Sequence, residues 1–160
     1  MSFWTRPTTA DVAIRAFGSS RSELFCESTY GMLNILSPGE LECTDLVAHD
    51  GVWSVECTSS DCGLLLIRWL DEVLYQLEVN DRWLIQMQGK LEENEGLWGF
   101  SAQVSWIISE NVEREIEIKA VTSHELQFKQ INPGEIVESQ WIEIPTIQGP
   151  GWFCDVVFDI

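Results

Sequence analysis

The stretch 115-EIEIKAVTSHEL-126 alternates charged and apolar residues and then passes into a short polar segment. Successive side chains of an extended chain point to opposite faces, so Ile116, Ile118 and Ala120 would line one face and the charged residues between them the other. The pattern predicts a half-buried strand that runs into a turn at 122–124. Such strands are usual in antiparallel sheets that have one covered face.

Lys119 and His124 lie within this stretch, in a chain that contains three lysines and two histidines. Lys119 would point to the solvent side of the strand, and His124 would lie on the turn. Polar residues on turns beside a rigid strand often carry function, which makes both residues candidates for a site. A solvated strand face followed by a loop histidine would give the same residue types.

The balance of charges bounds the possible partners. Nine Lys and Arg residues stand against 26 Asp and Glu residues, which gives a formal net charge of −17. A chain this acidic lacks the basic surface that DNA or RNA phosphates attract, so we expect no direct nucleic-acid binding. An acidic surface suits cations or a basic protein, and it also serves general solubility.

The cysteines and the N-terminal residues indicate the compartment. The five cysteines are Cys26, Cys43, Cys57, Cys62 and Cys154. Their odd number and the lack of a CxxC pair predict reduced thiols without a disulfide framework or a zinc site. The N-terminal residues lack the apolar core of a signal peptide, and the most apolar run, 64–70, is too short for a membrane span. We therefore expect a cytoplasmic protein with no membrane partner.

Periodicity and turn signals predict two helices among seven or eight strands. One helix would begin after Ser19 or Ser20 and end before Pro38, and the other would cover 63–77 behind the capping residues 59–61. The strands are predicted at 10–17, 52–57, 82–91, 97–108, 115–120, 126–130, 136–144 and 152–160. Because short turns join most of them, we expect a single α+β domain over 1–160, with both helices packed on largely antiparallel sheet.

No local motif declares a catalytic site. The sequence has no glycine-rich phosphate loop, no GxSxG and no HExxH. The polar candidates, which are distant in sequence, are Asp11, Lys119, His124, Asp155 and Asp159. A metal-dependent hydrolase with Asp11 or Asp159 as general base and His124 as general acid is one interpretation of them.

The last two residues suggest cation binding. Asp159 is followed by Ile160, whose terminal carboxylate would be a second anionic oxygen donor. If Asp11 lies beside the last strand, three carboxylates converge, and a hard divalent cation such as Ca²⁺ or Mg²⁺ prefers such donors. A frayed, solvated chain end is the alternative, although the apolar residues on either side of Asp159 favour a strand that docks.

Four stretches together resemble the archease family, small proteins that activate an RNA ligase of tRNA splicing. They are TADVAIRAFG (9–18), LLLIRWLDEVLY (64–75), EIKAVTSHEL (117–126) and VVFDI (156–160). Their order and spacing agree with the family from end to end. The sequence differs from the family pattern at Thr8, where the family has histidine, and at Ser123, where it has tyrosine.

The resemblance implies a function and a set of site residues. It implies that Asp11 and Asp159 bind a divalent cation, with Ca²⁺ as the expected ion, and the carboxylate of Ile160 joins them as the further donor inferred above. It further implies that Lys119 and His124 act in activation of the partner. The protein would help an RNA ligase accept guanylate and turn over repeatedly, and the catalytic nucleophile would belong to the ligase. A chaperone-like modulator of another RNA-modifying enzyme is the alternative within this class.

Overall fold

The computed structural model describes residues 1–8, 11–41 and 46–160, and within them it has an α+β fold. Two α-helices, one short 3₁₀ helix and nine strands occur in these parts of the chain. In chain order they are β1 (Phe3–Pro7), β2 (Val12–Gly18), α1 (Arg21–Leu36), β3 (His49–Glu56), α2 (Cys62–Glu78), β4 (Arg82–Asn94), β5 (Leu97–Ile108), η1 (Ser109–Asn111), β6 (Ala120–Ile131), β7 (Ile136–Val137), β8 (Ile147–Gln148) and β9 (Gly151–Asp159).

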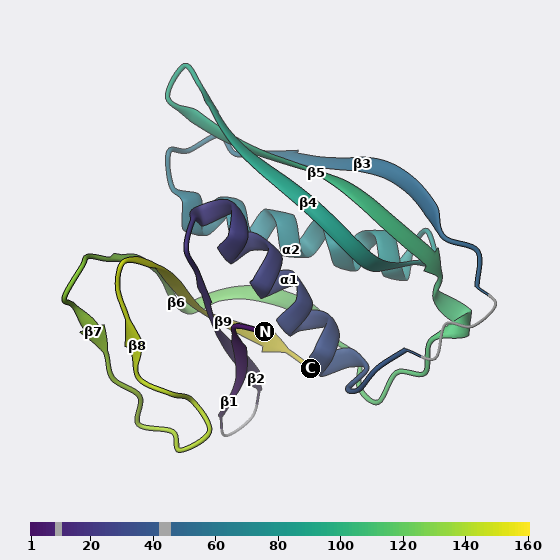
Figure 1. Ribbon diagram of the computed structural model, residues 1–160. Helices are drawn as coiled ribbons and strands as arrows, with labels where there is room; N and C mark the ends of the chain where they lie inside the picture. The colour runs from purple at the N-terminus through teal and green to yellow at the C-terminus, as the bar shows by residue number, and fades with distance from the viewer. Residues whose placement is uncertain (9–10, 42–45) are drawn as a thin grey trace.

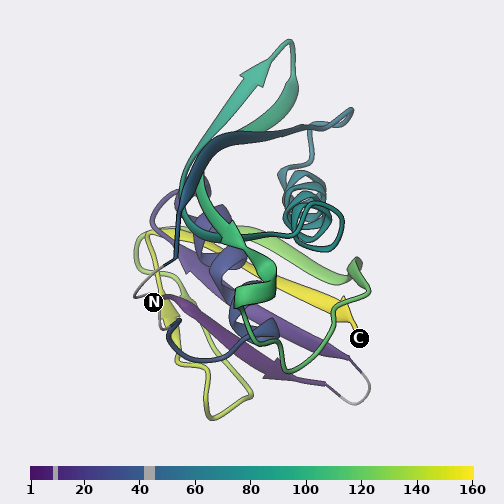
Figure 2. The ribbon, with the colours of Figure 1, turned by 90° about the vertical axis from the view of Figure 1, so that its right-hand side faces the viewer.

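The strands form two main sheets that enclose the helices. A four-stranded sheet has the order β1-β2-β9-β6, a three-stranded sheet has the order β3-β5-β4, and β7 pairs with β8 separately. All the pairings are antiparallel, as expected. Both helices lie between the two main sheets (Figure 1). The β4–β5 hairpin projects beyond this layer of helices (Figure 2).

Both helices begin at a side-chain cap, as the sequence predicts. The side chain of Ser20 accepts a hydrogen bond from the backbone N–H of Glu23, and that of Asp61 accepts from Gly63 and Leu64. These bonds satisfy backbone donors that the first turn of a helix leaves free. The sequence therefore positions the start of each helix locally.

One apolar cluster joins both helices to both main sheets. Trp69 of α2 is fully buried, packs edge-on against Phe100 of β5, and donates from its indole N–H to Thr29 of α1 at 2.8 Å. A buried indole needs such a partner for its N–H, and here the partner lies on the other helix. The helices are thus fixed to each other as well as to the sheets.

The segment predicted as a strand at 115–120 has the expected burial, but most of it is not a strand. Ile118 is buried, whereas Glu117 and Lys119 are exposed, so the alternation is confirmed. However, β6 begins only at Ala120. The N–H of Glu115 donates to the carbonyl of Leu36 at the end of α1 (2.8 Å), so the segment first follows the helix end and reaches β9 only at Lys119.

The turn predicted at 122–124 is wrong, because β6 continues through this segment to Ile131. The register with β9 shifts between Thr122 and Gln127, and Glu125 has a φ of 54°. The Thr122 hydroxyl accepts from the N–H of His124 (3.2 Å) and donates to the carbonyl of Val157 (3.0 Å). These bonds give the polar segment hydrogen-bond partners within the strand, where it forms a bulge.

Two further differences concern short strands. Of the strand predicted at 136–144, only Ile136–Val137 is formed, because Ile144 turns back onto the carbonyl of Trp141 (3.1 Å). Residues 136–148, here called the arm, extend from the body of the molecule (Figure 1). The strand Phe3–Pro7 was not predicted and pairs with β2.

No helix in the described parts of the chain is long and apolar enough to cross a membrane.

Candidate functional site

Asp11 and Asp159 come together through the pairing of β2 with β9. The register sets Val12, the first residue of β2, opposite Phe158. Asp11 precedes Val12 and Asp159 follows Phe158, so antiparallel pairing brings both carboxylates to the same end of the four-stranded sheet. Asp159 is exposed and Asp11 is half-buried.

The start of β6 adds Lys119 to the same end of the sheet. Ala120 lies opposite Asp159, and the N–H of Lys119 donates to the carbonyl of Asp159 at 2.7 Å. The ammonium Nζ of Lys119 is 3.4 Å from the backbone oxygen of Ile160. The lysine that the sequence singles out therefore lies beside the last two residues of the chain.

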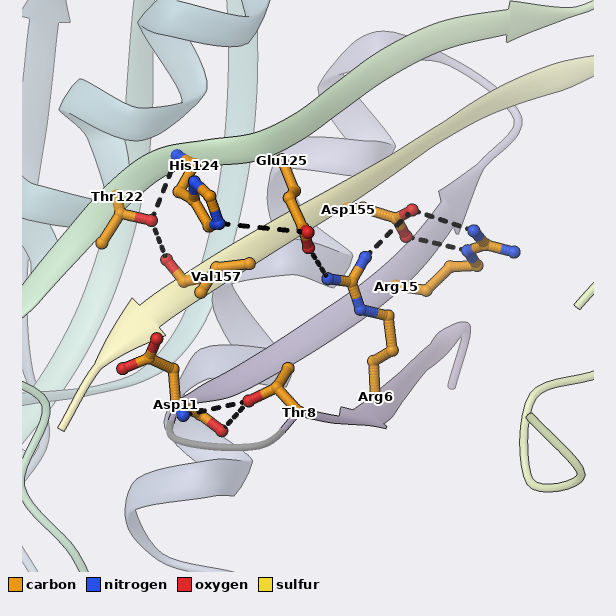
Figure 3. A network of polar contacts seen from close by, with 9 residues as sticks. All are labelled: Arg6, Thr8, Asp11, Arg15, Thr122, His124, Glu125, Asp155 and Val157. Atoms are coloured by element: carbon orange, nitrogen blue, oxygen red, sulfur yellow. Dashed lines mark hydrogen bonds and ion pairs between the residues drawn. The ribbon is translucent and has the colours of Figure 1, made fainter. Parts of the chain in front are cut away.

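Thr8 shapes the segment that carries Asp11. The N–H of Asp11 donates to the Thr8 hydroxyl at 3.0 Å, and that hydroxyl donates to the Asp11 carbonyl. The carboxylate of Asp11 points away from Thr8 (Figure 3). Thr8 holds the backbone of Asp11 and leaves its carboxylate free of this bond. Thr9 and Ala10, which belong to the first of the four family-like stretches, lie outside the described residues.

These donors fit a hard cation as part of a coordination shell. Among the described residues, no three side chains of His, Cys, Asp or Glu form a group that could hold a metal ion. The sheet end offers two carboxylates, from Asp11 and Asp159, together with the oxygen of Ile160, and hard divalent cations prefer such oxygen donors. Because Ca²⁺ takes about six to eight oxygens, water or a partner would have to complete the shell.

His124 lies apart from these residues. Its Nε2 is 3.9 Å from a carboxylate oxygen of Glu125, and its side chain is 73% exposed. Figure 3 shows the ring directed toward Glu125 and not toward Asp11. The structure thus groups Lys119 with the carboxylates at the sheet end and places His124 on the bulge of β6.

Glu125 connects this bulge to a buried group of charges under the arm. Arg15 binds Asp155 through two hydrogen bonds of 2.8 Å, and Arg6 lies 2.7 Å from Glu125 and 3.5 Å from Asp155. Both guanidinium groups lie over the ring of Trp141 in the arm. The hydrogen bonds to Asp155 raise the pKa of Arg15 above its usual value, although burial acts in the opposite direction. The arm is therefore fixed to the sheet by cation–π contacts.

This charged group was largely missed by sequence reasoning. Asp155 was a candidate, but its partner Arg15 is 140 residues away and belongs to a strand whose alternation indicated only burial. One signal was available, since an arginine and an aspartate in two strands with strongly apolar neighbours need each other if the strands pair. The sequence does not show which strands pair.

Sequence comparisons find relatives along most of this chain. The sequence profile of the Archease protein family (MTH1598/TM1083) matches residues 3–160. Protein archease of Methanosarcina mazei is 32% identical over 130 residues, which cover 79% of this chain and 85% of that protein. Protein archease of Methanosarcina barkeri is 27% identical over 155 residues, which cover 95% of this chain and 91% of that protein.

A solved structure has the same fold. The solution structure of Methanobacterium thermoautotrophicum protein 1598 aligns with a TM-score of 0.67 and 23% sequence identity, over 99% of both chains. The fold and the site together define a small α+β domain that presents two carboxylates and a lysine at one end of an antiparallel sheet. With the profile match over residues 3–160, the chain belongs to the archease family. The resemblance found in the sequence is confirmed.

Proposed function

We propose that this protein is an accessory factor that activates an RNA ligase of tRNA splicing or RNA repair. In this role it promotes guanylylation of the ligase and its repeated turnover, and the catalytic nucleophile belongs to the ligase. Membership of the archease family supports the proposal. The net charge of −17 supports a protein partner over direct contact with RNA.

One observation carries the proposal to particular residues. Lys119 Nζ lies 3.4 Å from the oxygen of Ile160, at the sheet end that also carries Asp11 and Asp159. An exposed lysine among carboxylates adds little to stability, because exposed ion pairs contribute about 0–1 kcal/mol. A lysine that the fold does not need is free to contact a phosphate or a carboxylate of the partner complex.

A divalent cation, with Ca²⁺ as the expected ion, is the second part of the proposal. When bound, it would supply positive charge that holds phosphate or carboxylate oxygens of the partner complex. Asp11, Asp159 and the oxygen of Ile160 would bind one side of the cation. The partner would supply the remaining oxygens, so binding of cation and partner would support each other.

Lys119→Ala tests this function, with Lys129→Ala as the matched control. Both lysines are exposed and belong to the same part of the chain, but Lys129 lies opposite Phe153, away from the sheet end. The assay measures guanylylation and turnover of the RNA ligase encoded by the same genome. We expect Lys119→Ala to lose most of the activation while keeping its melting temperature, and Lys129→Ala to activate normally. Equal activation by the two variants would remove Lys119 from the mechanism.

The two alternative functions predict other results, one in the ligase assay and one in an assay of the protein alone. A modulator of a different RNA-modifying enzyme would leave this ligase unchanged at every concentration of the wild-type protein. A metal-dependent hydrolase would turn over model phosphate esters without any partner, and Asp11→Asn and Asp159→Asn would abolish that turnover. The proposed activator gives stimulation of the ligase and no hydrolysis alone.

A further inference from the structure

The two main sheets have four outer strands, β1 and β6 in one sheet and β3 and β4 in the other. An outer strand leaves a row of backbone N–H and C=O groups without strand partners, and another chain can pair with such a row. The four edges of this protein differ in whether that row is free.

Helix side chains cover two of the edges. In β4, the N–H of Met87 donates to the hydroxyl of Tyr30 at 3.1 Å, and the Cys26 thiol lies against the N–H of Gly89. In β6, the carboxylate of Asp71 lies against the N–H of Val121. These three side chains belong to α1 and α2, so both edges are partly closed by the body of the protein.

The edge of β1 is short. The N–H of Phe17 donates to the carbonyl of Ser2 (2.8 Å), which makes these two residues a hydrogen-bonded pair of the ladder. Pairs of this kind alternate along an antiparallel ladder, so Phe3 and Thr5 direct their backbone groups outward. Pro7 follows them and has no N–H. The outward row of β1 therefore holds two donors.

The edge of β3 is longer, and no strand in the described part of the chain pairs with it. The N–H of Cys57 donates to the carbonyl of Trp98 at 2.9 Å, and β3 continues in the same register to His49 without a shift. The same alternation leaves every second residue of β3 with outward N–H and C=O groups. They are Asp50, Val52, Ser54 and Glu56. Among the described residues, β3 pairs with β5 alone, and no further backbone–backbone hydrogen bond reaches these groups.

The side chains of these four residues are exposed as well, and Val52 is 67% exposed. They lie on the outer face of the three-stranded sheet, beside a surface hollow of about 510 Å³ that Val52 and Gln103 help to line. The edge has no proline and no lysine, the residues that commonly prevent strand addition. Backbone and side chains are thus both accessible to an added strand.

We propose that the free edge of β3 binds an extended, basic segment of another protein as a fourth strand of this sheet. The acidic residues at this edge favour a basic segment over other partners. The edge carries Asp50 and Glu56 at its two ends. Glu56 lies opposite Gly99 of β5, and Gly99 lies opposite Glu92 of β4, so a second acidic residue lies in the same row across the sheet. With a net charge of −17, the surface attracts Lys and Arg side chains.

A second copy of the chain fits this edge poorly. Antiparallel self-pairing that sets Val52 opposite Ser54 of the second copy also sets Asp50 opposite Glu56, and directly opposed like charges destabilise a ladder. Each copy would further bring a net charge of −17. The basic segment removes both penalties.

The register defines the segment. In an antiparallel fourth strand, one basic residue would lie opposite Glu56 and a second, six positions later, opposite Asp50. The two same-face residues between them would lie opposite Ser54 and Val52, where threonine and valine fit the outer face of a sheet. The recognition pattern is therefore Lys-x-Thr-x-Val-x-Lys, with arginine acceptable in place of lysine.

A capped synthetic peptide with this pattern, and threonine at each x, tests the proposal against the isotope-labelled full chain. NMR titration should give saturable shifts centred on the amides of Val52 and Ser54, and the affinity should fall as salt is added. A scrambled peptide and one with glutamate in place of lysine should bind at least tenfold more weakly. Shifts that spread over the acidic surface, or equal binding of the scrambled peptide, would overturn the proposal.

Proline substitution separates the edge from general charge. Val52→Pro removes one outward N–H and leaves the ladder with β5 intact, and prolines are tolerated at such edge positions. Thr5→Pro makes the same change at the edge of β1 and is the matched control. We expect at least a tenfold loss of peptide affinity for Val52→Pro and none for Thr5→Pro. Unchanged affinity of a folded Val52→Pro variant would refute binding by strand addition.

If Val52→Pro does not fold, reversing the two acidic charges of the edge tests whether β3 binds the peptide. The double variant Asp50→Lys and Glu56→Lys should lose the lysine peptide and bind the glutamate peptide instead. Retained preference for the lysine peptide would refute the assignment. Sedimentation of the wild type alone should show a monomer. A dimer that Val52→Pro abolishes would overturn the proposal, because it would show that a second copy of the chain occupies the edge of β3. Ligase activation does not enter these measurements, so either proposal can fail without the other.

Discussion

Arg15 and Asp155 form a buried, two-bonded ion pair between β2 and β9. The Arg15 Nε and Nη2 atoms each lie 2.8 Å from an oxygen of the Asp155 carboxylate, and Asp155 is 1% exposed. The two residues are directly opposite in the strand register. The pair therefore fixes the alignment that also brings Asp11 to Asp159.

Breaking this pair should destabilise the protein strongly. Arg15→Met would leave Asp155 buried, with the more distant Arg6 at 3.5 Å as its charged neighbour. Loss of one partner of a buried pair lowers the free energy of unfolding by about 3–5 kcal/mol. Equilibrium unfolding in urea measures this loss. The double variant Arg15→Met and Asp155→Leu should recover much of the loss, since no unpaired carboxylate remains. A double variant less stable than Arg15→Met would contradict this account.

Two glycines of the three-stranded sheet should respond differently to alanine. A Cβ atom at Gly89 would overlap the ring of Phe100, which is 1% exposed and packs against Phe25 and Trp69. We expect Gly89→Ala to cost about 1–3 kcal/mol or more, because the ring has no space to move. At Gly99 the nearest atom would be 3.6 Å away, so Gly99→Ala should leave the thermal midpoint nearly unchanged. Equal midpoints for the two variants would show that the ring can move.

Cys154 should make stability fall at alkaline pH. Complete burial raises the pKa of its thiol from 9.0 to about 12. Between these values the unfolded chain loses the proton while the folded chain keeps it, so stability is fully present below pH 9 and falls as pH rises toward 12.

The slope from this one thiol is about 1.4 kcal/mol per pH unit. Burial also raises the pKa values of Cys26, Cys62 and Tyr30, which adds to the slope of the whole protein. The test compares how steeply the free energy of unfolding in urea falls with pH between pH 8 and 10.5 in the wild type and in Cys154→Ala. The variant should have the shallower slope, and parallel curves would disprove the assignment.

Calcium should raise the melting temperature if the sheet end binds it. At a free concentration 100 times the dissociation constant, mass action stabilises the folded chain by about 2.7 kcal/mol, or about 5–10 °C for a domain of this size. Asp11→Asn and Asp159→Asn should each remove most of this rise, and a chelator should reverse it. Asp81→Asn, an exposed aspartate outside the site, is the control. Calorimetry that detects neither Ca²⁺ nor Mg²⁺ binding to the wild type would end the metal proposal.

Local features of the fold could be predicted because their causes lie within a few residues. Ser20 and Asp61 cap the helices with their own side chains, and the alternation around Ile118 gives the correct buried face. The bulge at Thr122 could not be predicted in this way. Its polar residues also suit a turn, and the carbonyl of Val157 that keeps the segment in the strand comes from 35 positions away.

The sequence by itself determined the α+β class, the starts of the helices, the family, and the residue types that form the candidate site. Only the tertiary structure decided which of these residues meet. The order β1-β2-β9-β6 joins strands from opposite ends of the chain, and this brings Lys119 and Asp11 to the last residues while His124 remains with Glu125. Strand alternation fixes the face of each residue, whereas the choice of neighbouring strand depends on burial of the whole core and has no local signal.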